Sequence, residues 1–114
     1  MKVKNTNIVE IGGTNFKSEV IESKRAVLVA FLAPWSRPCG MILPVLDGVS
    51  VASTSSMKVV RINADDNPGL GMVYNIHSIP TLLCFVDGEE RTRIVGTASK
   101  EAILATLKPF IGTI

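Results

Sequence analysis

The chain is poor in the residues that build disulfide frameworks and metal sites. Its 114 residues include two cysteines and one histidine. Two cysteines are too few for a disulfide framework, and a structural zinc site takes four ligands. The histidine, His77, has no cysteine or acid at ligand spacing around it. We therefore expect no metal site, and we interpret His77 as a surface loop residue.

Long apolar runs and a strong net charge are also missing. No apolar run approaches the ~20 residues of a membrane span. The start, Met-Lys-Val-Lys-Asn-Thr-Asn, has basic residues without an apolar segment behind them, so we expect no secretory signal. The formal net charge of +2 is too small to indicate nucleic acid binding. These absences predict a cytoplasmic protein without nucleic acid or membrane partners.

What is present indicates one folded domain over residues 1–114. Apolar residues make up 46% of the chain and charged residues 19%, which allows a real hydrophobic core without disulfide staples. Strand-like apolar runs alternate with helix-like apolar faces, a pattern typical of an α/β domain. The predicted order is β-α-β-α-β-α-β-β-α.

The individual elements follow from local pattern. Residues 26–32 form a continuous apolar run, which is typical of a central strand buried on both faces. Asp87-Gly88 is a strong hairpin signal between two strands, and Ser99 is a helix cap candidate. The predicted strands are 26–32, 58–63, 81–86 and 91–95. The predicted helices are 14–21, 38–50 with a kink at Pro44, 67–74, and a last helix after Ser99.

Residues 35–39 read Trp-Ser-Arg-Pro-Cys and fall between the strand 26–32 and the helix that follows it. This places them at the carboxyl end of a strand and at the positive end of a helix dipole. A dithiol enzyme needs Cys-x-x-Cys at this place, but the first position is Ser36. One hydroxyl and one thiol cannot close a disulfide. Ser36 also fits a helix N-cap, with Arg37 and Pro38 in the first turn.

Several further segments share an order and spacing with one known family. They are Phe-Leu-Ala-Pro-Trp at 31–35, Pro-Cys-Gly-Met-Ile-Leu-Pro-Val-Leu-Asp at 38–47, Arg-Ile-Asn-Ala-Asp-Asp-Asn-Pro at 61–68, Ile-His-Ser-Ile-Pro-Thr-Leu at 76–82, and Asp-Gly-Glu at 87–89 followed by Val-Gly at 95–96. With these segments the chain resembles the thioredoxin family over essentially its whole length. The resemblance implies a thioredoxin fold, an α/β architecture with a central mixed β-sheet and helices on both faces.

The resemblance also implies roles for individual residues. The family motif is Trp-Cys-Gly-Pro-Cys, so Ser36 takes the position of the attacking cysteine and Cys39 that of the resolving one. Pro80, after Ile79, matches the family's cis-proline. A surface around these positions would hold an extended segment of a partner by backbone pairing. The substrate-binding candidates are Trp35, Arg37, Pro38, Ile79, Pro80 and Gly96.

Other positions depart from the family pattern. Arg37 stands where glycine is usual, and Leu32 where many members have a second tryptophan. Ala30 occupies the position of the family's buried aspartate, which is thought to help move the proton of the resolving thiol. These departures leave open whether a form with cysteine at residue 36 would be fully active.

The cysteines and their neighbours carry further expectations. Cys39 should be shielded in the helix behind Ser36. Cys84 lies four residues beyond Pro80 on a predicted strand, about 13 Å along it. If Pro80 faces Cys39, as the resemblance implies, the two cysteines are too far apart for a disulfide, and Cys84 should be a core residue. We expect Trp35 to be exposed toward partners. Asp65-Asp66 should start the turn into the next helix.

Three functional hypotheses follow. In the first, Ser36 disables dithiol-disulfide exchange and the chain binds protein segments. In the second, it is an ordinary cytoplasmic thioredoxin, a protein-disulfide reductase served by thioredoxin reductase, with an engineered cysteine-to-serine change. The third and weakest is a monothiol or glutathione-linked enzyme using Cys39, with the Ser36 hydroxyl bonding a bound thiolate. All three predict a monomer without a cofactor.

Overall fold

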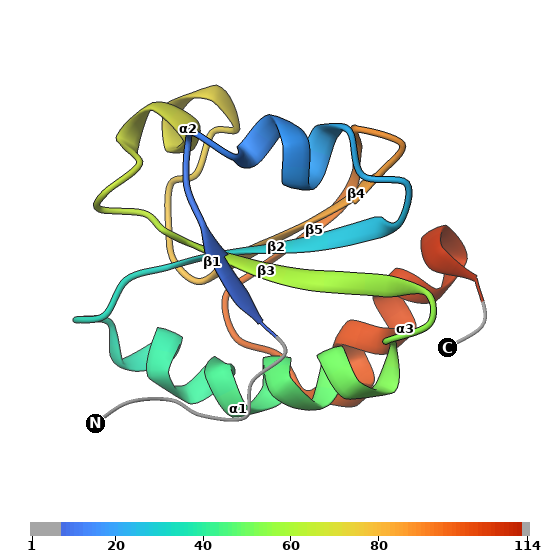
Figure 1. The fold of residues 1–114 in the computed structure, drawn as a ribbon. Coiled ribbons are helices and arrows are strands. Elements are labelled where there is room, and N and C mark those ends of the chain that lie inside the picture. Colours follow the sequence, from blue (N-terminus) through green and yellow to red (C-terminus); the bar gives the residue numbers. More distant parts are fainter. Residues whose placement is uncertain (1–7, 113–114) are drawn as a thin grey trace.

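The computed structural model describes residues 8–112 of the chain (Figure 1). The predicted absence of a secretory signal falls on residues 1–7 and lies outside this part. The strands are β1 (Val9–Ile11), β2 (Ala26–Leu32), β3 (Met57–Asn63), β4 (Thr81–Val86) and β5 (Glu89–Val95). The helices are η1 (Lys17–Ile21), α1 (Arg37–Ala52), α2 (Pro68–Val73) and α3 (Lys100–Ile111). The element order agrees with the predicted one.

The five strands form one mixed sheet in the order β1-β3-β2-β4-β5. β1, β3 and β2 run parallel to one another, whereas β4 runs antiparallel to β2 and β5 antiparallel to β4. β2 lies at the centre, and six of its seven residues are buried. A strand covered on both faces needs apolar side chains in both directions, which explains its unbroken apolar run.

Helices cover both faces of the sheet, as the resemblance implied. Figure 1 shows α1 and α3 below the sheet, and η1 and α2 above it. The core under α1 and α3 includes Leu28, Leu46 and Ile103. The core on the other face includes Phe16, Phe31 and Phe85. Neighbouring residues of β2 alternate between these two cores, as the two-residue period of a strand requires.

Several predicted boundaries need correction. The first helix is a five-residue π-helix, Lys17–Ile21, instead of a helix over 14–21. Residues 12–15 form a turn closed by the Asn15 side chain, which accepts the Gly12 N–H at 2.8 Å. α1 begins at Arg37, directly after its predicted cap Ser36 and one residue before the predicted helix start, and it runs to Ala52 with Pro44 inside it. β3 begins one residue earlier than predicted, and α2 is shorter at both ends.

The hairpin contains a feature that the sequence did not predict. β5 begins at Glu89, two residues before the predicted start, because Glu89 pairs with Val86 directly after the Asp87-Gly88 turn. Further along, the pairing with β4 is shifted between Cys84 and Phe85. Cys84 pairs with Thr92 and Phe85 with Glu90, so Arg91 is an additional residue on β5, a β-bulge. The turn takes positive φ at Asp87 (53°) and Gly88 (80°), as a tight hairpin turn requires.

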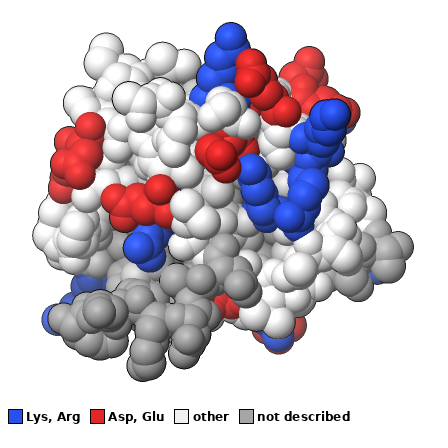
Figure 2. Space-filling model, viewed as in Figure 1, with Lys and Arg blue, Asp and Glu red and all other residues white. Residues whose placement is uncertain are grey.

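The surface is mixed in charge. Figure 2 shows Lys and Arg side chains interspersed with Asp and Glu on the viewed face. α2 contributes no charged residue to this surface, since its sequence is Pro-Gly-Leu-Gly-Met-Val. Among residues 8–112, no helix is both long enough and apolar enough to cross a membrane.

Candidate functional site

Ser36 ends the loop between β2 and α1 and caps α1. Its backbone is extended (φ −86°, ψ 121°), and its Oγ accepts the Cys39 N–H at 3.3 Å. Its own N–H donates to the Ala33 carbonyl at 3.2 Å. The predicted cap is confirmed, and the Ser36 side chain, only 7% exposed, satisfies one of the free donors of the helix start.

Cys39 lies one turn into α1 and is buried, with 2% of its surface exposed. Its Sγ accepts the Ala33 N–H at 3.5 Å. The expected shielding of this thiol is confirmed. Both cysteines are free thiols, as predicted from their separation along the sheet.

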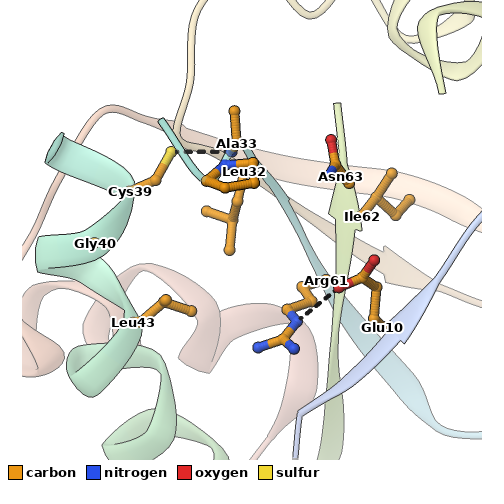
Figure 3. Close-up of a pocket in the computed structure, with 10 residues that line it drawn as sticks. Glu10, Leu32, Ala33, Cys39, Gly40, Leu43, Arg61, Ile62 and Asn63 are labelled. Atoms are coloured by element: carbon orange, nitrogen blue, oxygen red, sulfur yellow. Dashed lines mark hydrogen bonds and ion pairs between the residues drawn. The ribbon is translucent and has the colours of Figure 1, made fainter. Parts of the chain in front are cut away.

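A pocket of about 230 Å³ lies behind Cys39, between the start of α1 and the β1–β3 edge of the sheet. Figure 3 shows the Cys39 thiol beside Ala33 at one end and the Arg61–Glu10 pair at the other. Arg61 Nε and Glu10 Oε1 are 3.4 Å apart. Leu32 also lines this pocket. Ala30 is fully buried and brings no polar group to the core below β2.

Trp35 is exposed, with 71% of its surface accessible, as expected. Its indole Nε1 donates to Asp65 Oδ2 at 2.7 Å. The turn predicted at Asp65-Asp66 is present, since both N–H groups donate to Asn63 Oδ1, at 2.9 and 3.3 Å. The contact between Asp65 and Trp35 was missed. A signal for it was available, because both residues follow neighbouring parallel strands and such ends share one edge of a sheet.

The Ile79-Pro80 bond is cis, as the resemblance implied. The Gly96 N–H donates to the Pro80 carbonyl at 2.8 Å, which brings these two predicted site residues together. Gly96 has φ +89°, a conformation that favours glycine. Within residues 8–112, no hydrogen bond engages the backbone N–H or carbonyl of Ile79. Because Ile79 is only half-buried, these two groups are available to an extended segment laid beside them.

A groove of about 910 Å³ lies between the motif, α2 and the segment that leads to Pro80. Trp35, Ser36, Pro38 and Ile79 line it together, and Arg37 stands exposed beside it. The full lining is Trp35, Ser36, Pro38, Ala64, Pro68, Gly71, Met72 and residues 75–79. Cys39 lines the pocket behind instead.

Most of the groove lining was not predicted, and Met72 and His77 are two of the lining residues that sequence reasoning missed. Met72 is 79% exposed, and this exposed methionine on the uncharged α2 extends the apolar lining away from Trp35. His77 is exposed, as predicted, yet it also lines the groove. From sequence alone, a methionine on a short helix is expected to be a core residue. The exposure of Met72 therefore could not be predicted.

Cys84 is unrelated to the groove. It is fully buried in β4, where it pairs with Leu28 of β2. Burial raises the pKa of the Cys84 thiol to about 11, and the nearby Arg91 charge opposes part of that rise. The prediction that Cys84 is a core residue is confirmed.

Comparison with known proteins agrees with the fold. The family model described as thioredoxin matches residues 7–109. The chain is 42% identical to thioredoxin of Porphyra purpurea over 92% of this chain and 98% of that protein. It is 45% identical to thioredoxin 1 of Synechococcus elongatus over 81% and 86%. It is 34% identical to the M-type chloroplastic thioredoxin of Spinacia oleracea over 91% and 58%. On the fold, the family model and these relatives together, the chain belongs to the thioredoxin family.

Proposed function

We propose that this chain binds extended protein segments in the groove beside Ser36 and does not carry out dithiol-disulfide exchange. The observation that carries the binding proposal is the pair of unused backbone groups at Ile79, at the edge of an apolar groove. An extended segment there would pair with Ile79, as peptides do when they add to a strand edge. Trp35, Pro38, Pro80 and Gly96 would surround that segment, with Arg37 beside it.

The loss of exchange follows from the chemistry at residue 36. In an exchange reaction, a thiolate at residue 36 attacks a substrate disulfide and forms a mixed disulfide. The Cys39 thiolate then attacks that bond, which leaves a 36–39 disulfide and two substrate thiols. A serine hydroxyl cannot form the mixed disulfide. Among residues 8–112, no acidic or histidine side chain forms a hydrogen bond with the Ser36 hydroxyl that could activate it.

Binding is measured with the reduced, carboxymethylated insulin B chain, which has no thiol to react. Trp35 is the only tryptophan of the chain and lines the groove, so its fluorescence reports occupancy. We expect a saturable change in emission. Calorimetry of Trp35→Ala should show binding weakened about tenfold, the loss of an exposed aromatic anchor. The matched control is Val51→Ala, which removes an exposed apolar side chain (66% accessible) at the far end of α1. Equal binding by both variants would contradict the proposal.

The second hypothesis, an oxidoreductase parent with cysteine at residue 36, is supported by the buried Cys39 thiol one turn after residue 36 and by the cis Ile79-Pro80 bond. Insulin reduction is measured with Ser36→Cys beside the unaltered chain. We expect brisk turnover by Ser36→Cys, with thioredoxin reductase or dithiothreitol as electron donor, and none by the unaltered chain. A silent Ser36→Cys protein would show that the rest of the site has drifted, and would leave binding as the function.

The remaining expectations belong to the same proposal. We place the protein in the cytoplasm as a monomer and treat residues 1–114 as one domain. Its partners would be protein clients bound as extended segments.

A further inference from the structure

Arg93 of β5 connects the sheet to the end of α2. Its Nε and Nη2 donate to the two carboxylate oxygens of Glu90 at 2.6 and 2.8 Å. The same guanidinium donates to the Tyr74 carbonyl at 2.9 Å through Nη2 and to the Asn75 carbonyl at 3.4 Å through Nη1. Paired charges of this two-pronged kind have a fixed geometry, so the carboxylate sets the direction in which Arg93 points.

The β-bulge at Arg91 makes this pair possible. Residues three apart on a regular strand point to opposite faces of the sheet. Here Arg93 lies opposite Leu83 and Glu90 opposite Phe85, and both partners belong to the core under η1 and α2. The additional residue therefore places Glu90 and Arg93 on one face. Arg91 contacts the Phe110 ring of α3 instead, with its guanidinium carbon 5.7 Å from the ring centre.

The carbonyls that Arg93 binds stand where α2 ends and the groove begins. Tyr74 caps the carboxyl end of this six-residue helix, and Asn75 has φ 56°, in the left-handed region. The last carbonyls of a helix lack partners within it, and a cation there is favourable. Residues 76–79, which follow directly, line the groove up to Ile79. The direction in which this segment leaves α2 is thus fixed by contacts from β5.

We propose that Arg93, oriented by Glu90, is a positioning residue for the groove, holding residues 75–79 in the conformation that presents the Ile79 backbone to a bound segment. The proposal rests on the proposed function for its ligand. Its structural half, the ordering of residues 75–79 by Arg93, stands independently.

The test compares Arg93→Ala, Arg93→Lys and Glu90→Gln with Arg91→Ala. The last variant removes the same charge from the same strand, but from the side that faces α3. Affinity for the carboxymethylated insulin B chain is read from Trp35 fluorescence. Amide hydrogen exchange is followed at Ile76, whose N–H donates to the Gly71 carbonyl at 2.8 Å, and at Val29 in the central strand.

We expect Arg93→Ala to weaken binding about five- to tenfold and to accelerate exchange at Ile76 about tenfold, with Val29 unchanged. Arg93→Lys should recover part of both losses, because an ammonium can still bind a carbonyl. For Glu90→Gln, we expect an affinity and an exchange rate at Ile76 between those of Arg93→Ala and Arg93→Lys. Arg91→Ala should bind as the unaltered chain does.

Unchanged exchange at Ile76 in Arg93→Ala would overturn the proposal, as would equal acceleration at Ile76 and Val29, which would make Arg93 a general stabiliser. If Ile76 alone accelerates and affinity stays the same, the positioning role for binding is overturned. If the unaltered chain does not bind the insulin B chain at all, the proposed function fails, and the exchange data still decide whether Arg93 orders the segment.

Discussion

The surroundings of the Ser36 hydroxyl, which the resemblance places at the position of the attacking thiol, give it a structural role. Ser36 Oγ accepts the Cys39 N–H, so the side chain that would attack a disulfide caps a helix instead. Cys39 is left as a buried thiol with an Ala33 N–H directed at it. A monothiol enzyme needs an exposed sulfur, and both Cys39 and the neighbouring Ser36 hydroxyl are buried. This burial disfavours the third hypothesis.

Cys84 provides a prediction about pH at the scale of one residue. Burial raises the pKa of the Cys84 thiol from 9.0 to about 11. Below the unfolded-state pKa of 9.0 both the folded and the unfolded chain keep the proton, and the burial of the neutral thiol contributes its full stabilisation. From there to about pH 11 the unfolded chain releases the proton and the folded chain does not, so the free energy of unfolding falls by about 3 kcal/mol.

The measurement is the free energy of unfolding of the unaltered chain and of Cys84→Ala from pH 7 to 11. Subtracting the two removes the titration of lysines and tyrosine, which both proteins share. We expect the advantage of the unaltered chain to shrink as the pH rises. A difference that stays constant to pH 11 would show that Cys84 titrates normally.

Among the elements, α1 positions the candidate site, because Ser36 and Pro38 at its start line the groove. Ser36 caps it, as Ser99 caps α3 by accepting the Ala102 N–H at 3.1 Å. We expect Ser36→Ala to lower the free energy of unfolding by about 1 kcal/mol, and Ser99→Ala by a similar amount, since each leaves a helix donor unpaired. Denaturant unfolding measures this, with Ser55→Ala, in the exposed turn after α1, as the neutral control. If Ser36→Ala lowers the free energy of unfolding no more than Ser55→Ala does, the capping role of Ser36 is contradicted.

Predictability from sequence varied among the elements for physical reasons. β2 and β4 were predicted with their observed bounds, because continuous apolar runs between turns have few alternatives. The cap at Ser36 was also predicted, because the serine hydroxyl and the following Arg37 and Pro38 all favour a helix start at this point. The π-helical form of η1 and the bulge at Arg91 were not, because both depend on packing across the sheet. The same holds for the Trp35–Asp65 and Arg93–Glu90 contacts, whose partners come together only in the folded chain.

For the whole molecule, the pocket behind Cys39 is a gap in the packing between α1 and the β1–β3 side of the sheet. Leu32 lines it, and a larger side chain there would reach into it. We expect Leu32→Trp to raise the unfolding free energy by about 1 kcal/mol, as cavity filling commonly does. It should also slow alkylation of Cys39 in the folded protein.

Thermal unfolding and mass spectrometry of alkylated Cys39 measure the two effects. Leu32→Ala is the matched variant that enlarges the gap, and it should cost about 2–5 kcal/mol and speed the alkylation. A Leu32→Trp protein that unfolds at a lower temperature would show that the pocket walls cannot accept an indole.

The position of β5 at one edge of the sheet has a consequence for self-association. An unpaired edge strand can recruit another chain and lead to aggregation. Here that strand carries Glu89, Glu90, Arg91 and Arg93 and is bent by a bulge. At the opposite edge of the described part of the sheet, β1 has three residues. Charge, irregularity and shortness all discourage a neighbouring copy from extending the sheet. Both described edges of the sheet are therefore poor templates for pairing with a second copy of this chain, in contrast to the backbone groups of Ile79.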